Sequence, residues 1–164
     1  IQEASDLNPV SFYGLTKLLG EELCKFYNKR YNIPVIILRI FNLYGPGQQK
    51  GFVIPDIFSK LGNEKIILKN PFPKRDFVYV DDVAESIEKS MERMPQGAIN
   101  IGSGESYSIR EIAEKIADKR IVEYLQEGEK SDICADINKA KKVLNWKPKT
   151  SLDEGLRQIE INLI

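Results

Sequence analysis

Tyr13 and Lys17, near the start of the sequence, have the residue types and the spacing that proton transfer requires. Residues four apart on a helix lie on one face, so the phenol and the ammonium come within reach of each other. A free phenol has a pKa of about 10 and is a poor base at neutral pH, whereas a neighbouring ammonium stabilises the phenolate. Such a tyrosine can accept a hydroxyl proton while hydride leaves the same carbon. The lysine can hold the ribose of the nicotinamide dinucleotide that this chemistry needs.

The spacing of this pair is a weak signal by itself, because the chain has 7 tyrosines and 24 lysines and arginines. A chance match would place a half-buried tyrosine and a solvated lysine on an amphipathic helix. The segments that flank the pair must therefore decide between a catalytic role and a purely structural one.

The composition is that of an ordinary globular protein, with 42% hydrophobic and 29% charged residues. The 24 basic and 24 acidic side chains balance, so bulk charge predicts no nucleic-acid or membrane partner. Histidine is absent, which excludes Ser-His-Asp and Cys-His catalysis and His-ligated metal within this sequence, and we expect no metal site. Cys24 and Cys134 fit no metal spacing and indicate a reducing compartment, which we expect to be the cytoplasm.

Helices and strands are expected to alternate along the chain, which favours the α/β class. Proline is tolerated in a first helical turn, so Asn8-Pro9 is expected to open the first helix. Strands are expected at 35–38, 66–68, 77–80, 98–101 and 121–125. Helices are expected at 8–31, 52–61, from the capping pair Asp81-Asp82 to Met94, at 108–117, at 138–144 and from Ser151 onward, with a loop at 42–51.

Six blocks of sequence follow one another in the order of a known family. They are PVSFYGLTK at 9–17, LRIFNLYGPG at 38–47, KRDFVYVDDVA at 74–84, NIGSG at 100–104, ADINKA at 135–140 and LNWKP at 144–148. Together they resemble the extended short-chain dehydrogenase family that acts on nucleotide sugars, and most of all its UDP-glucose 4-epimerases. Several blocks in register are far more specific than any one of them, and they cover nearly the whole chain.

On the cofactor side, the resemblance implies that Tyr13 is the base and Lys17 its partner, with both also binding NAD. It implies that Phe41 lies beside the nicotinamide. On the substrate side, Asn42 would bind the phosphate or the sugar.

Three further substrate contacts are implied by the same blocks. Val53 would lie near the nucleotide, Leu68 would pack against the base, and Arg75 would bind the diphosphate, to which a guanidinium is well suited. The structural alternative for Arg75 is a surface salt bridge with Asp76 or Asp82. For Asn42 the corresponding alternative is a residue that merely shapes a turn.

The sequence departs from the family pattern in the stretch before the ADINKA block. Gln126 stands where the family often has an arginine that contacts the diphosphate, and Glu129 stands where an aspartate lies near the ribose. We still count both among the candidate substrate-binding residues, and two alternatives stay open: the phosphate affinity is weaker, or another group replaces the missing arginine. The loop 69–74 also lacks the glycines that are usual in the family.

The family's glycine-rich phosphate loop and its catalytic Ser or Thr would precede Ile1, so the resemblance implies the C-terminal half of an enzyme. The expected fold class is α/β: the C-terminal part of a Rossmann-type parallel sheet plus a small mixed α/β substrate-binding subdomain. Residues 1–45 would be the remnant of the dinucleotide-binding domain. Residues 46–164 would bind the substrate, with some segments returning to the sheet.

The first functional hypothesis is therefore a nucleotide-sugar 4-epimerase that works by transient oxidation at C4, with NAD held mainly by the absent half and this chain inactive alone. A 4,6-dehydratase, a UDP-glucuronate decarboxylase or a reductase on the same scaffold stays open, as does a non-catalytic nucleotide-sugar-binding module. A homodimer is also implied, through the helix that carries Tyr13 and the helix that follows it. On the first of these, the side chains that could serve that contact or the core are Leu18, Leu19, Cys24 and Phe26.

Overall fold

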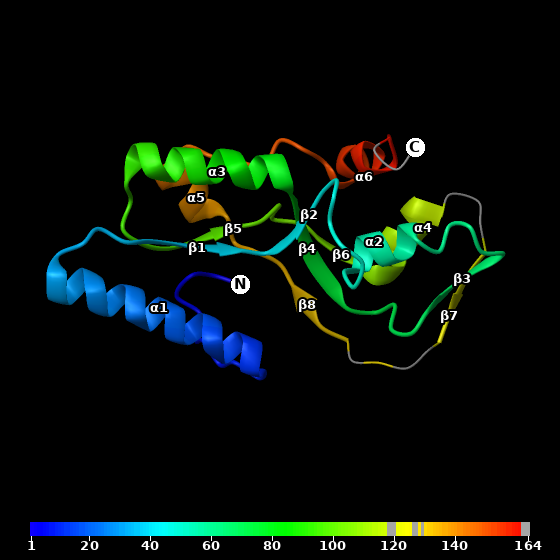
Figure 1. Cartoon of the computed structure of the whole chain (residues 1–164), viewed down its shortest axis with the longest axis horizontal. Coiled ribbons are helices and arrows are strands. Elements are labelled where there is room, and N and C mark those ends of the chain that lie inside the picture. The colour runs from blue at the N-terminus through cyan, green and yellow to red at the C-terminus, as the bar shows by residue number, and fades with distance from the viewer. Residues whose placement is uncertain (118–120, 126–127, 129, 162–164) are drawn as a thin grey trace.

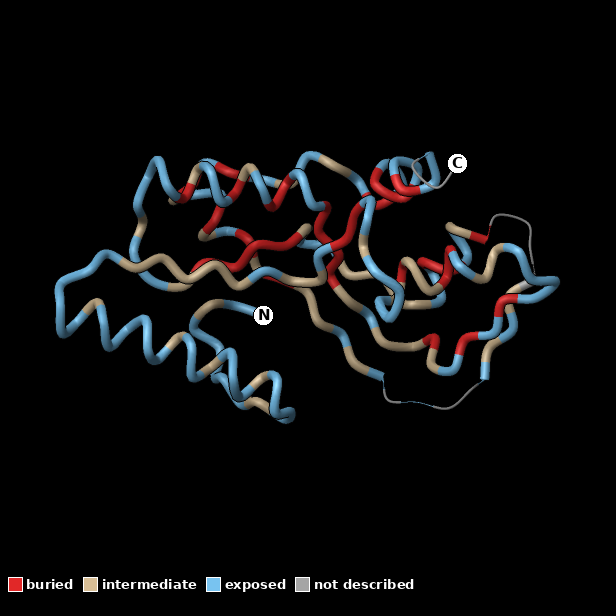
Figure 2. Tube along the Cα trace, viewed as in Figure 1, coloured by how far each residue is buried: buried red, intermediate tan, exposed pale blue. Residues whose placement is uncertain are grey.

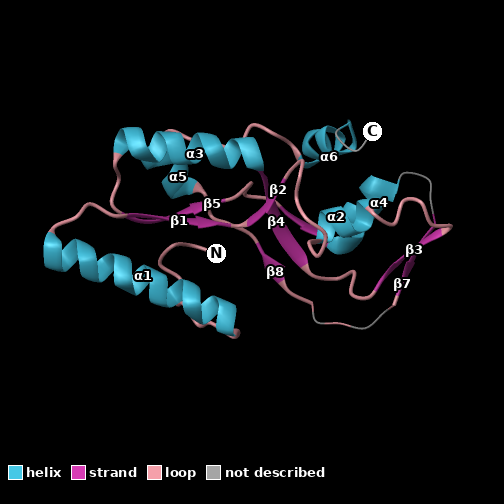
Figure 3. Ribbon diagram, viewed as in Figure 1, coloured by secondary structure: helices cyan, strands magenta, loops and turns pink. Residues whose placement is uncertain are grey.

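The computed structural model describes residues 1–117, 121–125, 128 and 130–161, which form a mixed α/β arrangement (Figures 1 and 3). The helices are α1 (Phe12–Tyr31), α2 (Val53–Phe58), α3 (Val80–Arg93), α4 (Ile109–Ala117), α5 (Asn138–Leu144) and α6 (Leu152–Ile161). The strands are β1 (Ile36–Ile40), β2 (Asn42–Tyr44), β3 (Lys65–Leu68), β4 (Lys74–Tyr79), β5 (Gly97–Ile101), β6 (Ser106–Ser108), β7 (Ile121–Tyr124) and β8 (Asp132–Ile133). Within the described part of the chain, no helix has the length and apolar character to cross a membrane.

The helix α1 starts and stops where its end residues can satisfy the backbone. The Ser11 hydroxyl accepts a hydrogen bond from the Gly14 amide at 3.1 Å, which caps the first turn. Asn32 ends the helix in the left-handed region at φ 55°, a conformation that asparagine tolerates. The predicted end near Tyr31 is confirmed, whereas Pro9 lies before the helix and not in its first turn.

The strand β1 pairs with β5 in parallel, from Ile36 opposite Gly97 to Ile40 opposite Ile101. Figure 1 shows α3 and α5 on one side of this pair and α1 on the other. Figure 2 shows the difference between the two sides, since α3 and α5 carry buried positions and α1 has none among its residues. One face of the β1–β5 pair therefore packs against α3 and α5. On the other face, α1 lies beside the strands without contributing a buried residue.

The strand β4 is the centre of the second sheet. It pairs in parallel with β2 and β8 and antiparallel with β6. A separate parallel pair, β3 with β7, lies further along the molecule (Figure 1). The strand β4 thus brings Arg75 beside Tyr107 of β6 and Ile133 of β8, although these residues are far apart in sequence.

The buried side chains form two clusters. One includes Tyr44, Phe77, Ile112 and Leu156 and holds α2, α4 and α6 against β4. The other is built around Trp146, which is 1% exposed and packs with residues of α3, α5 and β5. The Trp146 indole donates to the Asp82 carbonyl at 2.9 Å, so the burial of its polar atom is compensated.

The structure corrects two local predictions and adds two short strands. Residues 42–44 form β2, although the Gly-Pro-Gly segment after them suggested a loop throughout 42–51. The helix α3 begins at Val80, so Asp81 and Asp82 lie in its first turn and do not cap it. The short strands β6 and β8 were not predicted, because three and two residues carry too little periodicity to detect. The capping box of α4 is confirmed: the Glu111 carboxylate accepts from the Ser108 amide at 2.7 Å and the Ser108 hydroxyl accepts from the Glu111 amide at 3.1 Å.

Candidate functional site

A hollow of ≈ 690 Å³ lies where α1, the β1–β2 segment, α2 and β4 meet. Its lining includes five of the residues that the sequence pointed to: Tyr13, Phe41, Asn42, Val53 and Arg75. They come from segments up to 62 positions apart in the chain, from 13 to 75, and only the fold brings them to one place. Among the described residues that line this hollow, Arg75 has the one charged side chain.

Tyr13 and Lys17 lie on one face of α1, as their spacing predicts. The Lys17 ammonium sits 5.0 Å from the centroid of the Tyr13 ring, and the Tyr13 side chain is 70% exposed. Both residues also line a second hollow of ≈ 610 Å³ between α1 and β1. The phenol therefore faces open space on the side of the candidate substrate and lies next to the ammonium.

The side chain of Asn42 is held in place at the start of β2. Its amide donates to the backbone carbonyl of Asp76 on β4 at 2.8 Å, and Asn42 pairs in register with Phe77. The residue is half-buried within a strand, so it does not merely shape a turn. One amide hydrogen and the side-chain carbonyl are left for a ligand, because an asparagine amide has two donor hydrogens.

Arg75 forms no salt bridge with the described residues, so the alternative of a pair with Asp76 or Asp82 is wrong. Its guanidinium donates to the Ser131 hydroxyl at 2.8 Å and to the carbonyl of Lys74 at 2.8 Å. Both aspartates turn away, to the backbone amides of other segments. A guanidinium with neutral acceptors keeps its full charge for an anionic ligand.

Among the described candidate residues, Lys17 and Leu68 do not line this hollow. Leu68 is 7% exposed and packs in the first core cluster, away from the lining. Gln126 and Glu129 lie outside the residues that the structure describes. The sequence missed Gln48, Phe52, Phe77 and Ile133 in the lining. Phe52 is 58% exposed although it is a large aromatic residue, which only the structure reveals.

A protein-family model described as GDP-mannose 4,6 dehydratase matches residues 1–159 of the chain. The putative UDP-glucose 4-epimerase of Methanocaldococcus jannaschii is 36% identical over 170 residues, which is 97% of this chain and 55% of that protein. UDP-glucuronic acid decarboxylase 6 of Arabidopsis thaliana is 32% identical over 169 residues, with 94% and 49% covered. The chain spans about half the length of these relatives.

Solved structures agree with the sequence comparison. A variant of UDP-glucuronic acid 4-epimerase from Bacillus cereus, in complex with a fluorinated UDP-glucuronic acid and NAD, superposes with a TM-score of 0.88 at 32% identity. The match covers 99% of this chain and 55% of that one. The predicted α/β fold class is confirmed.

Proposed function

Because this chain belongs to the family described as GDP-mannose 4,6 dehydratase, we propose that it forms the substrate half of an NAD-dependent nucleotide-sugar 4-epimerase of the UDP-glucose type. The observation that carries the proposal is the shared hollow, where the Tyr13 phenol and the Arg75 guanidinium converge with Asn42. A nucleotide sugar has a hydroxyl to deprotonate at one end and a diphosphate to bind in the middle. The Tyr13 phenol can accept the proton of that hydroxyl, and the Arg75 guanidinium can bind that diphosphate.

Each residue has a distinct role in this proposal. Arg75 binds the diphosphate through its guanidinium, which lacks an acidic partner among the described residues. Asn42, fixed through the Asp76 carbonyl, donates its second amide hydrogen to the substrate. Tyr13 takes the proton of the C4 hydroxyl, and Lys17 stabilises the phenolate. Val53 and Phe41 give the hollow apolar walls.

The residues present fit a nicotinamide dinucleotide on the side of the second hollow. Lys17 and Tyr13 offer an ammonium and a hydroxyl there, against an apolar floor made by Ile36, Ile37 and Leu38. When bound, the dinucleotide accepts and returns a hydride. We propose that a further cofactor-binding part supplies most of its contacts, and that residues 1–45 adjoin this part while 46–164 form the substrate region. The isolated chain would then be inactive.

Homodimerisation through α1 is part of the proposal. Leu19 and Phe26 on α1 are 54% and 56% exposed, so neither is used by the core of this chain. Cys24 is exposed too, but it lines the second hollow and is not counted in this contact. A second copy would cover Leu19 and Phe26. Sedimentation velocity at several concentrations tests this part, and a monomer at every concentration would contradict it.

The test of the proposed function is a 4-epimerase assay on the longest polypeptide that the gene encodes, with NAD and UDP-galactose supplied. Tyr13→Phe should lower turnover by about a hundredfold or more, because the proton acceptor is removed. Tyr27→Phe is the matched control, since Tyr27 lies on the same helix with 50% exposure and lines neither hollow.

Other products in the same assay would support a different function. Release of CO₂ from UDP-glucuronate would support the decarboxylase that the Arabidopsis relative suggests. A 4-keto-6-deoxy sugar would support a dehydratase, as the family's description does. Tight binding of UDP-sugars with no turnover in the longest polypeptide would support a binding module.

A further inference from the structure

The helix α1 carries both proposed proton-transfer residues and yet has no core contact to hold it. None of its residues is buried. The second hollow, of ≈ 610 Å³, separates it from β1 and is lined by Tyr13, Lys17 and Glu21 on one side and by 36–40 on the other. Something other than apolar packing must therefore set the distance between the helix and the strand.

One ion pair crosses this hollow. The Arg39 guanidinium of β1 donates from Nε to Glu21 Oε1 at 2.8 Å and from Nη2 to Glu21 Oε2 at 2.7 Å. The two side chains are only 19% and 14% exposed. Such a two-point contact fixes an angle as well as a distance, because both groups are planar.

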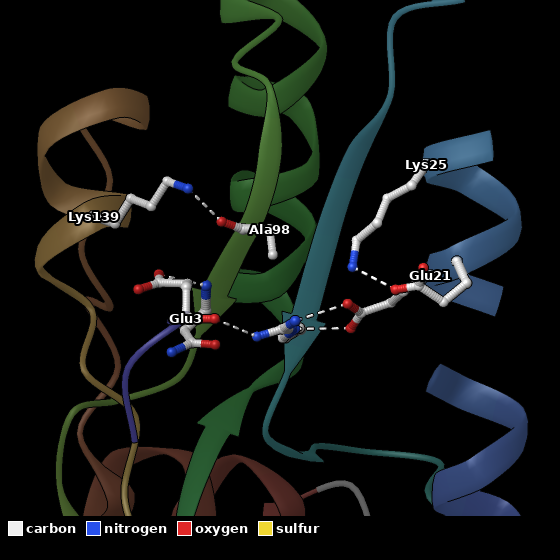
Figure 4. A network of polar contacts seen from close by, with 8 residues as sticks. Glu3, Glu21, Lys25, Ala98 and Lys139 are labelled. Atoms are coloured by element: carbon white, nitrogen blue, oxygen red, sulfur yellow. Dashed lines mark hydrogen bonds and ion pairs between the residues drawn. The ribbon is translucent and has the colours of Figure 1, made fainter. Parts of the chain in front are cut away.

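The same guanidinium extends the connection beyond the strand. Arg39 Nη1 donates to the Glu3 carbonyl at 2.9 Å, and the Glu3 carboxylate accepts from the backbone N–H of Asn100 on β5 at 2.9 Å. Figure 4 shows Glu3 and Glu21 on opposite sides of β1. Four segments of the chain therefore meet at Arg39, and α1 is tied to the packed β1–β5 pair through it.

The positions of the two residues connect this contact to the site. Glu21 follows Lys17 by four residues and Tyr13 by eight, so all three lie on one face of α1. Arg39 precedes Phe41 and Asn42 by two and three residues. A movement of the ion pair would thus move the proposed base relative to the proposed substrate contacts.

We propose that Arg39 and Glu21 are positioning residues, which hold the face of α1 that carries Tyr13 and Lys17 at a set distance from Asn42 and Arg75. This inference rests on the proposed function for its catalytic consequence. Its structural part, that one ion pair sets the placement of α1, stands independently of which sugar is bound.

The structural part is tested by the distance between two spin labels, at Lys29→Cys on α1 and Glu88→Cys on α3, in a chain with Cys24→Ser and Cys134→Ser. Both label positions are exposed. This doubly labelled chain without further substitutions, the parent, should give a narrow distribution of distances between the two labels. Glu21→Gln and Arg39→Lys should each broaden it, since a lysine cannot make the two-point contact. The charge swap, Glu21→Arg with Arg39→Glu, should narrow it again.

Glu22→Gln is the matched control. Glu22 neighbours Glu21 on the same helix but pairs with Lys25 on the surface, with side chains 57% and 53% exposed. It should leave the distribution unchanged. Equal distributions for Glu21→Gln and Glu22→Gln would overturn the proposal.

The catalytic part is tested on the longest encoded polypeptide with NAD. Arg39→Lys should lower kcat about tenfold or more while changing the affinity for UDP-glucose by less than about twofold, because Arg75 and Asn42 lie on other elements. Unchanged kcat in a variant with a broadened distance distribution would overturn the positioning role. If the parent converts no UDP-sugar, the proposed function fails, and the label distances alone decide whether this pair places α1.

Discussion

The side-chain amide of Asn42 donates a 2.8 Å hydrogen bond to the backbone carbonyl of Asp76, and the Asp76 carboxylate is itself completely buried. That carboxylate accepts from the amide and hydroxyl of Ser103 at 2.6 and 2.8 Å, from the Gly104 amide at 3.0 Å and from the Ala135 amide at 3.1 Å. One buried side chain thus connects β4 with the turn after β5 and the segment after β8. The candidate substrate contacts Asn42 and Arg75 are placed by that connection.

Asp76→Asn should lower the free energy of unfolding by about 3 kcal/mol, because an amide nitrogen would face backbone donors where a carboxylate oxygen accepted from them. Urea unfolding followed by the fluorescence of Trp146, the single tryptophan, measures the change. Asp81→Asn, at an exposed position in the first turn of α3, should cost less than about 1 kcal/mol. Equal costs for the two variants would contradict the role of Asp76.

Gly102→Ala should destabilise the same connection by steric overlap. A Cβ at Gly102 would lie 2.6 Å from the Ala135 Cβ and 2.7 Å from the Asp76 carboxylate. We expect a loss of about 2 kcal/mol in urea unfolding, since overpacked cores typically lose this much. Gly62→Ala is the control, as nothing lies within 4 Å of its added Cβ. A tolerated Gly102→Ala would mean that the turn can move away from Asp76.

The attachment of α1 should weaken at acid pH. The hydrogen bonds from Arg39 hold the pKa of Glu21 below its ordinary value of 4.5, against the opposing effect of burial, and Arg39 and Lys25 add favourable charge. A depressed pKa means that this stabilisation is complete above about 4.5 and is lost as the pH falls through the lower, folded-state pKa. In the parent, the spin-label distance distribution should therefore broaden as the pH falls through the depressed pKa of Glu21. Glu21→Gln should give a broad distribution already at neutral pH, with no further broadening from this group in acid. Equal responses of the parent and Glu21→Gln to acid would contradict the role of this carboxylate.

The sequence predicted most of the helices and strands because they are long enough to show a period. The helix expected at 8–31 and the strand expected at 35–38 are confirmed as α1 and β1, with starts and ends shifted by up to four residues. The two-residue strand β8 has no such signal, and it is defined by its parallel pairing with β4. The exact start of α3 was also beyond the sequence, since Tyr79 caps it without a side-chain hydrogen bond.

The residues of the candidate site could be predicted from the sequence through spacing and resemblance. The contacts that hold these residues in place could not. Tyr13 and Lys17 are local on one helix, so their proximity followed from helical geometry. Ser131, which holds Arg75, lies 56 residues away, and no pattern in either segment indicates the contact. The position of Leu68 in the core follows from the strand alternation of β3, whose inward face packs on the first core cluster.

The proposed function requires this chain to bind a nucleotide sugar through Arg75. Calorimetric titration of the chain with UDP-glucose measures that binding. We expect binding that weakens about tenfold or more in Arg75→Leu, because a charge-assisted contact to the diphosphate is lost. Arg110→Leu, which breaks an exposed pair with Glu114, should leave the affinity unchanged. Binding that is equal in the parent and in Arg75→Leu, or no binding to the parent, would contradict the claim.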